Sequence, residues 1–172
     1  ISIDRKSSNN DFAIKMPLPE SAEGLYFAEN KVSTIVFVEG TEYGGIILGS
    51  SINIEENTIT YTGRTWRGLI SQYIIEPPAG QDYRIVSGNL AQSIRTLPMH
   101  PIFTVEDTTY SGGTFQFERY ISVLDGINDL LVAADPDLRF SLKFTQTEGD
   151  YDGTVSFEIV KVRDLSNMVE VS

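Results

Sequence analysis

The sequence predicts an α+β chain that is rich in β-strand. In its first third, apolar and polar residues alternate, as at Phe12, Ile14 and Met16, which is typical of strands with one buried face. Between residues 122 and 134, apolar residues instead recur every three or four positions, the period of a helix with one apolar stripe. A chain of 172 residues can bury one large core or two small ones. We therefore expect a β-rich domain over residues 1–75 and an α+β domain over residues 76–172.

Strands near residues 12–16 and 32–38 and a hairpin over residues 46–63 are predicted for the first domain. The hairpin turns at the polar quartet Glu55-Glu56-Asn57-Thr58, and apolar residues on both sides of this turn indicate one buried face. They are Ile46, Ile47, Leu48, Ile52 and Ile54 before the turn and Ile59 and Tyr61 after it. From Thr65 the spacing changes, and a new apolar stripe predicts a short helix. Its members are Trp66, Leu69, Ile70 and Tyr73.

A seam between the two domains is predicted near Pro77–Gly80. Pro77 and Pro78 end whatever element precedes them, because proline has no N–H to donate and disfavours a helical residue before it. Beyond this seam, Ser87 is predicted to cap a helix that runs past Leu90 and stops at Pro98.

The end of the second domain has the clearest pattern. Phe115, Phe117 and Tyr120 predict a strand, and the longest helix follows over about residues 122–134. Alternation over residues 140–144 and 155–159 then predicts a strand pair, with a hairpin turn of Asp-Gly chemistry over residues 147–153.

Charge and composition exclude several classes of function. The net charge is −11, divided as −5 over residues 1–60, +2 over residues 61–100 and −8 over residues 101–172. Such an acidic body repels phosphate, although the repulsion would suit a surface past which DNA slides without sticking. There is no cysteine, so disulfides and thiolate metal sites are excluded. No apolar stretch approaches the roughly 20 residues that cross a bilayer, so we expect no membrane span.

Candidate catalytic groups are few. His100 is the only histidine, and we interpret it as a loop residue beside Pro101. The sequence has no nucleophile elbow and no phosphate-binding glycine loop. Gly112-Gly113 is interpreted as a flexible turn. Two carboxylates could in principle serve a glycosidase, but the sequence does not indicate which pair.

Two acidic segments resemble ligand sites only superficially. Asp150 and Asp152 imitate the start of a calcium loop but lack its later ligands, so a hairpin turn is favoured. Asp135-Pro136-Asp137 follows the long helix and is interpreted as a turn. We therefore predict that the chain is not an enzyme and has no cofactor or metal.

Three segments in the middle of the chain carry a resemblance to a known family. They are Glu42-Tyr43-Gly44-Gly45-Ile46-Ile47, Asn57 to Ile70 with Gly63-Arg64-Thr65-Trp66-Arg67 at its centre, and Ile74-Ile75-Glu76-Pro77-Pro78 through Tyr83. This order of strand, Gly-Arg, helix and Ile-Ile-x-Pro-Pro resembles the siphophage and prophage tail-tip proteins, also called baseplate hub or tail-associated proteins. Weaker matches follow the same order at Asp4-Arg5, Asp11-Phe12, Gln116-Phe117 and Leu124-Asp125-Gly126-Ile127.

The resemblance implies a fold and an assembly. Proteins of this family form a ring, typically a trimer, at the end of the tail tube, from tube-like β-barrels with an inserted α/β domain. Residues 1–75 would then be a tail-tube-like β-barrel lacking its first strand, which would lie upstream of Ile1, and a further domain would follow Ser172. The implied partners are copies of itself and other phage tail proteins, and DNA would pass without specific binding. The implied location is the virion, assembled in the bacterial cytoplasm.

Within this resemblance, the structural motif consists of Gly63, Arg64, Trp66, Arg67, Pro77 and Pro78. Gly63 would allow close backbone approach where strand turns to helix, Trp66 would bury against the hairpin, and Arg64 would bind carbonyls or an acidic neighbour. We interpret this motif as a packing corner inside one subunit, with a direct contact between subunits as the alternative. Two rival functions stay open, namely a carbohydrate- or receptor-binding module of a phage tail and a cell-wall hydrolase domain.

Overall fold

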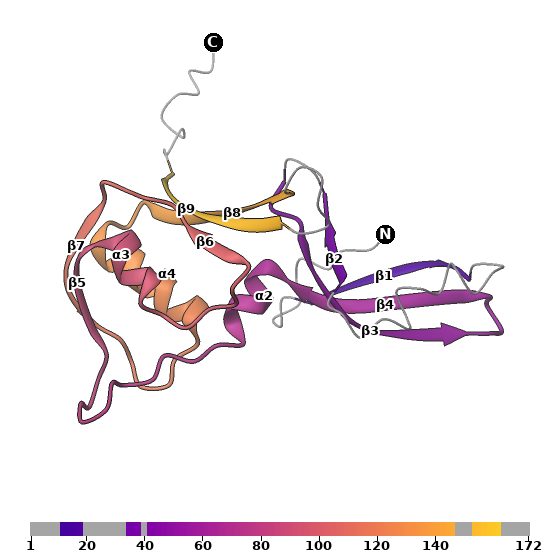
Figure 1. Cartoon of the computed structure of the whole chain (residues 1–172), viewed down its shortest axis with the longest axis horizontal. Coiled ribbons are helices and arrows are strands. Elements are labelled where there is room, and N and C mark those ends of the chain that lie inside the picture. The colour runs from indigo at the N-terminus through magenta and orange to yellow at the C-terminus, as the bar shows by residue number, and fades with distance from the viewer. Residues whose placement is uncertain (1–10, 19–33, 39–40, 147–152, 163–172) are drawn as a thin grey trace, which may run out of the picture. The chain divides into compact units, whose positions relative to one another are not determined.

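The computed structural model describes residues 11–18, 34–38, 41–146 and 153–162. The chain divides into two compact units, Ile1–Gln72 and Tyr73–Ser172, whereas the sequence suggested a boundary after residue 75. Most of the regular structure is β-strand, in several sheets (Figure 1). The α+β, β-rich fold class is confirmed at this level. None of the sheets is closed into a barrel by the described strands.

The first unit contains a four-stranded antiparallel sheet, here called sheet A. Its strands are β1 (Asp11–Pro17), β2 (Thr34–Phe37), β3 (Gly44–Asn53) and β4 (Thr58–Thr65). They lie in the order β1-β4-β3-β2, and Figure 1 shows β1, β4 and β3 running side by side. Among the described strands, β1 and β2 therefore each have a neighbour on one side only.

Opposed residues of neighbouring strands share a face of the sheet. In sheet A, apolar residues of β1, β4 and β3 gather in this way on one face. Phe12 lies opposite Gly63 on this face, and Met16, Ile59 and Ile52 form a row across β1, β4 and β3. Phe12 and Ile59 are buried, as is Tyr61 between them on β4. The predicted alternation is thus confirmed in β4, whereas in β1 only Phe12 is buried and Met16 is exposed.

The alternation predicted for β3 breaks at a bulge between Ile47 and Gly49. The extra residue changes the phase, so that Ile52 shares a face with Ile47 rather than with Ile46. Leu48, Ile52 and Ile54 are exposed. The predicted buried face of the hairpin is therefore wrong for the second half of β3 and the turn that follows it.

One hydrogen bond at the end of β1 shows which of its residues direct their backbone groups away from β4. The N–H of Leu18 donates to the carbonyl of Asn57 at 2.9 Å, just beyond the opposed pair Pro17 and Thr58. Because successive residues of a strand direct their N–H and C=O groups to opposite sides, Pro17 faces away from β4. Ala13 and Lys15 direct their backbone groups to that same outer edge.

The second unit places two helices between two small sheets (Figure 1). A strand pair, β5 (Ile85–Asn89) and β7 (Ser111–Gln116), is antiparallel. The other sheet has the order β6 (Phe103–Val105), β9 (Gly153–Lys161) and β8 (Leu138–Gln146), with β6 parallel and β8 antiparallel to β9. The helices are α3 (Leu90–Arg95) and α4 (Val123–Ala134).

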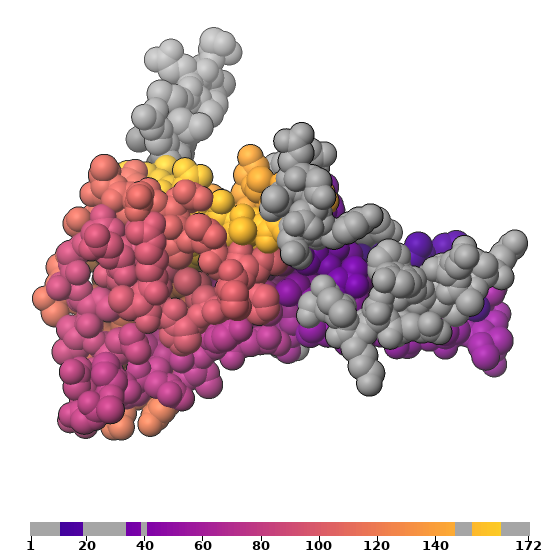
Figure 2. Space-filling view, in the orientation of Figure 1, coloured from indigo at the N-terminus to yellow at the C-terminus, as the bar shows by residue number. Residues whose placement is uncertain are grey.

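Apolar side chains from α4, β8 and β9 form the core of this unit. The helix buries one stripe, and alternate residues of both strands point inward. The buried members include Ile127, Leu130, Leu131, Phe140, Leu142, Val155, Phe157 and Ile159. The segments from β5 to β6, magenta to red, form most of the face of this unit seen in Figure 2. The predicted long helix and strand pair are confirmed, and the turn predicted over residues 147–153 lies mostly outside the described residues.

Three predictions in the second unit differ from the structure. Ser87 lies in strand β5, and the cap of α3 is Asn89, whose side chain accepts from the N–H of Gln92 at 3.0 Å. Gly112-Gly113 is part of strand β7 rather than a turn, because this segment pairs with β5, where Gly112 lies opposite Gly88. A Cβ on Gly112 would also lie 3.2–3.3 Å from Leu90 and Ala134. The strand expected at residues 115–120 also ends earlier, at Gln116.

Candidate functional site

The glycine–arginine corner lies where β4 meets helix α2 (Trp66–Ser71). We use this name for Phe12, Gly44, Gly45 and residues 63–67. The ring of Phe12 lies over Gly63 and Gly45: a Cβ on Gly63 would be 2.5 Å from Cζ of Phe12, and one on Gly45 would be 2.8 Å from its Cε1. Both hypothetical atoms would also collide with a backbone carbonyl, that of Ile46 or of Arg64. Only glycine allows the strands and the ring to approach this closely.

The indole of Trp66 packs closely against another glycine, Gly44. Trp66 is buried at the start of α2, and a Cβ on Gly44 would lie 2.5–2.8 Å from its indole. Thr65 caps the helix, because its hydroxyl accepts from the N–H of Gly68 at 3.1 Å. Gly63 and Trp66, which the sequence marked, therefore lie in a packed turn from strand to helix.

Both arginines of the motif are paired with carboxylates. Arg64 forms an ion pair with Asp11 at 3.0 Å, directly across from it on β1, and Arg67 pairs with Glu42 at 3.4 Å. All four side chains keep a third to a half of their surface in water, so we expect each pair to contribute little to stability.

Pro77 and Pro78 lie in the other unit. They begin a loop that turns at Gly80, which has a φ of +77°, and the N–H of Gln81 closes this turn onto the carbonyl of Pro78 at 3.0 Å. Arg84 holds the loop in place. Its guanidinium donates to the carbonyls of Glu76 at 3.2 Å and Thr96 at 3.1 Å.

Replacing Arg84 with alanine is expected to loosen this loop, because both carbonyls lose their charged donor. Amide hydrogen exchange of residues 79–83 should become faster, while exchange in α4 should stay unchanged. Lys143→Ala, at an exposed position of β8, is the matched control and should leave the loop protected. Unchanged exchange in the Arg84 variant would mean that the loop is held by other contacts.

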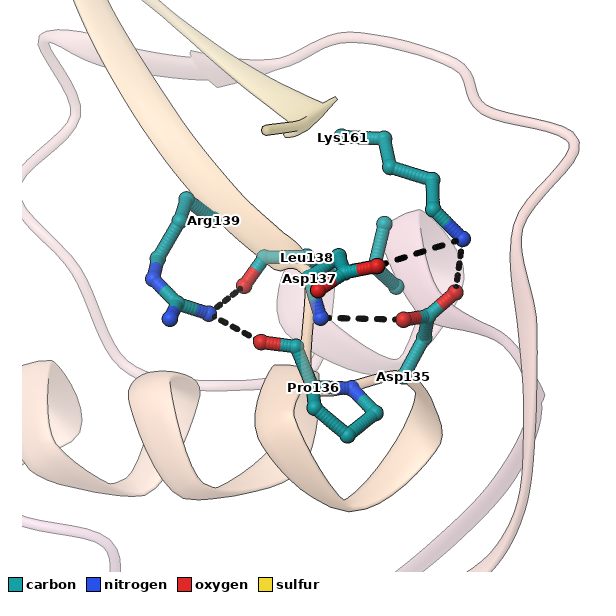
Figure 3. A network of polar contacts seen from close by, with 6 residues as sticks. All are labelled: Asp135, Pro136, Asp137, Leu138, Arg139 and Lys161. Atoms are coloured by element: carbon teal, nitrogen blue, oxygen red, sulfur yellow. Dashed lines mark hydrogen bonds and ion pairs between the residues drawn. The ribbon is translucent and has the colours of Figure 1, made fainter. Parts of the chain in front are cut away.

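A second polar cluster joins the end of α4 to strand β9 (Figure 3). Asp135 ends the helix: one of its carboxylate oxygens accepts from the N–H of Asp137 at 2.9 Å, and the other accepts from Nζ of Lys161 at 2.5 Å. Lys161 also lies 3.9 Å from Asp137, and Arg139 donates to the carbonyls of Pro136 and Leu138. The predicted turn at Asp135-Pro136-Asp137 is confirmed. Lys161, which the sequence analysis did not select, places a positive charge at the carboxyl end of the helix, where it is favourable.

The hydrogen bond between Lys161 and Asp135 shifts the pKa of both side chains. It lowers the pKa of Asp135 below its ordinary 3.8, with the Asp137 N–H as a second cause, and it raises the pKa of Lys161 above its ordinary 10.5. The lowered carboxyl pKa gives stability above pH 3.8 that is lost as pH falls through the folded-state value. The raised amine pKa gives stability below pH 10.5 that is lost as pH rises through the folded-state value.

Lys161→Gln is accordingly expected to lower the melting temperature most between roughly pH 5 and pH 9. The difference from the unaltered protein should shrink toward both pH extremes, because one partner then loses its charge. Lys143→Gln, which removes the same charge from neighbouring β8, serves as the control. A difference that stays constant across the whole pH range would show that Lys161 acts through packing instead.

His100 makes a local turn contact. Its Nδ1 accepts from the N–H of Ile102 at 3.2 Å, and its carbonyl accepts from the N–H of Phe103 at 3.1 Å. Within the described ranges, no group of three or more histidine, aspartate or glutamate side chains is placed to hold a metal ion. The calcium-like residues Asp150 and Asp152 lie outside those ranges.

No protein-family model matches this chain, and a search of curated proteins finds no match either. None of the described helices has the length and apolar character that crossing a membrane requires. The arrangement at the corner can shape and stiffen the junction between a sheet and a helix. The residues described there are engaged in packing, capping and ion pairing.

Proposed function

We propose that this chain is a structural subunit of a bacteriophage or prophage tail tip. It would assemble with copies of itself into a ring at the end of the tail tube, contact other tail proteins, and let DNA pass through without binding it specifically. Its location would be the virion, after assembly in the bacterial cytoplasm. The motif order from Gly44 to Pro78 is the origin of this proposal.

The observation that carries the proposal is the use made of the motif residues. The ring of Phe12 packs against Gly63, and the indole of Trp66 packs against Gly44. Thr65 caps α2. Arg64 and Arg67 are held by Asp11 and Glu42. The motif residues between Gly63 and Arg67 all support one rigid junction, which suits a subunit wall better than a reaction centre.

Sheet A supports the assembly part of the proposal. It is open among the described strands, and an exposed edge strand is a ready template for pairing with another chain. In the proposed tail-tube-like barrel, the four described strands would form one part of the wall. Further strands, from other segments or from other copies, would complete it.

Self-association is the first test of this proposal. Sedimentation velocity over a concentration series should show the purified chain converting from monomer to a closed oligomer, with a trimer as the expected species. The stronger test is electron microscopy of the phage particle that contains the protein. Density for the protein away from the tail axis would reject the proposal.

A carbohydrate-binding module is the second candidate, and exposed tyrosines favour it. Trp66 and Tyr61 are buried, but Tyr83 and Tyr120 expose enough ring surface to stack on a sugar. Glycan-array binding that disappears in a Tyr83→Ala/Tyr120→Ala variant would favour this candidate. Binding that survives both substitutions would count against it.

A further inference from the structure

The tip of the β3–β4 hairpin presents an unusual combination of groups. Ile54 is 84% exposed there, and Glu55 beside it makes no ion pair with any described residue. The tip is nevertheless well ordered: the side chain of Asn53 accepts from the N–H of Glu56 at 3.1 Å, and Glu56 is paired with Lys15. An exposed isoleucine next to a carboxylate that pairs with none of the described residues suits a contact with another protein surface.

The second unit carries a patch of complementary character, formed by Ile74, Arg119 and Tyr120. Tyr120 has a φ of +60°, which is strained for an aromatic residue, and it is 60% exposed. The guanidinium of Arg119 lies 5.8 Å from the centre of its ring, within cation–π range. The backbone N–H of Tyr120 donates to the carbonyl of Ile75 at 3.2 Å, which places the backbone of Tyr120 beside the segment that carries Ile74, itself 49% exposed.

We infer that the hairpin tip of one copy docks on this patch of a second copy. Ile54 packs against Tyr120 and Ile74, and the carboxylate of Glu55 pairs with the guanidinium of Arg119. The two surfaces match in both respects, because each offers an exposed apolar group next to a charge of opposite sign. The inference rests on the proposed self-assembly and assigns a surface to it.

Such a contact joins two different surfaces, so each copy uses its tip toward one neighbour and its patch toward the other. Contacts of this head-to-tail kind close into rings when the rotation between neighbours permits it. The few residues involved bury less than the ~1,000 Å² of a stable interface, so a single contact is expected to be weak. Closure of a ring, in which each copy is held twice, would strengthen it.

The absence of cysteine from the sequence provides a direct test. Glu55→Cys and Arg119→Cys are prepared as separate single-cysteine variants with tags of different mass, then mixed and oxidised. Docking should make the mixed disulfide dimer form about tenfold faster than in a mixture of Glu55→Cys with Lys143→Cys, because docking raises the effective concentration of the two thiols. Equal rates in the two mixtures would overturn the inference.

Charge reversal at Glu55 and Arg119 provides a second, independent test of the docking surface. Glu55→Arg and Arg119→Glu should each shift self-association to higher concentration, and the two changes combined in one chain should restore it. Glu118→Lys should strengthen association, because Glu118 is exposed beside the patch and would repel the acidic tip. If the unaltered chain forms oligomers that none of these changes affects, the surface is wrong but the proposed self-assembly stands. If the chain stays monomeric and forms no mixed disulfide dimer under any condition, both the docking surface and the proposed self-assembly are wrong.

Discussion

Gly63→Ala is expected to destabilise the first unit by about 2–4 kcal/mol, although it adds a single carbon. The new Cβ would collide with the carbonyl of Ile46 and lie 2.5 Å from the ring of Phe12. Neither group can move without separating β3 from β4 or lifting Phe12 out of the core. Trp66 is the only tryptophan of the chain and lies in the same corner, so urea unfolding followed by its fluorescence measures the effect.

Gly49→Ala is the matched control for this prediction. Gly49 lies in β3, opposite Thr62, and the nearest atom to its Cβ would be Oγ1 of Thr62 at 3.6 Å, an ordinary contact. We expect a change within about 0.5 kcal/mol at this position. Equal losses in both variants would show that the effect comes from the general cost of leaving glycine, and the close-packed corner would then be the wrong explanation.

Phe157→Ala is expected to cost the second unit about 3–5 kcal/mol. Phe157 is fully buried in β9, the central strand of its sheet, and its ring stacks on Phe140 with the ring centroids 4.5 Å apart. Removing the ring leaves a cavity that the surrounding strands cannot fill without losing their register. Far-UV circular dichroism during urea unfolding, where the strands of this unit contribute, checks the result.

Thr104→Ala tests whether burial is the cause. Thr104 lies on β6 of the same sheet but is exposed, so its replacement should change stability by less than about 0.5 kcal/mol. A comparable loss in both variants would contradict the assignment of Phe157 to the centre of the core.

Elements with local signals could be predicted from the sequence. Helix α4 combines an apolar stripe with the cap Ser122, whose hydroxyl accepts from the N–H of Asp125 at 3.1 Å, and every part of that signal lies within thirteen consecutive residues. Strands β8 and β9 alternate without interruption, and their pairing was predicted for the same reason. In contrast, the cap of α3 was predicted at Ser87, two residues before the observed cap Asn89. The start of this helix depends on where β5 stops pairing with β7, which the local sequence does not contain.

The corner shows the same limit at the candidate site. Gly63 and Trp66 could be selected from the resemblance, but their partners Phe12 and Gly44 lie on other strands. Only the register of sheet A brings these residues together. Lys161 was missed because its contact with Asp135 joins positions 26 residues apart on different elements.

The placement of Pro17 limits how sheet A could be extended. An incoming strand would find donors on the outer edge of β1 at Ala13 and Lys15, and none at Pro17, whose ring replaces the N–H that faces that side. The ladder could therefore not continue past this point. Proline here would limit the length of any strand that pairs with this edge. It would also discourage continued edge-to-edge addition of strands, which leads to fibres.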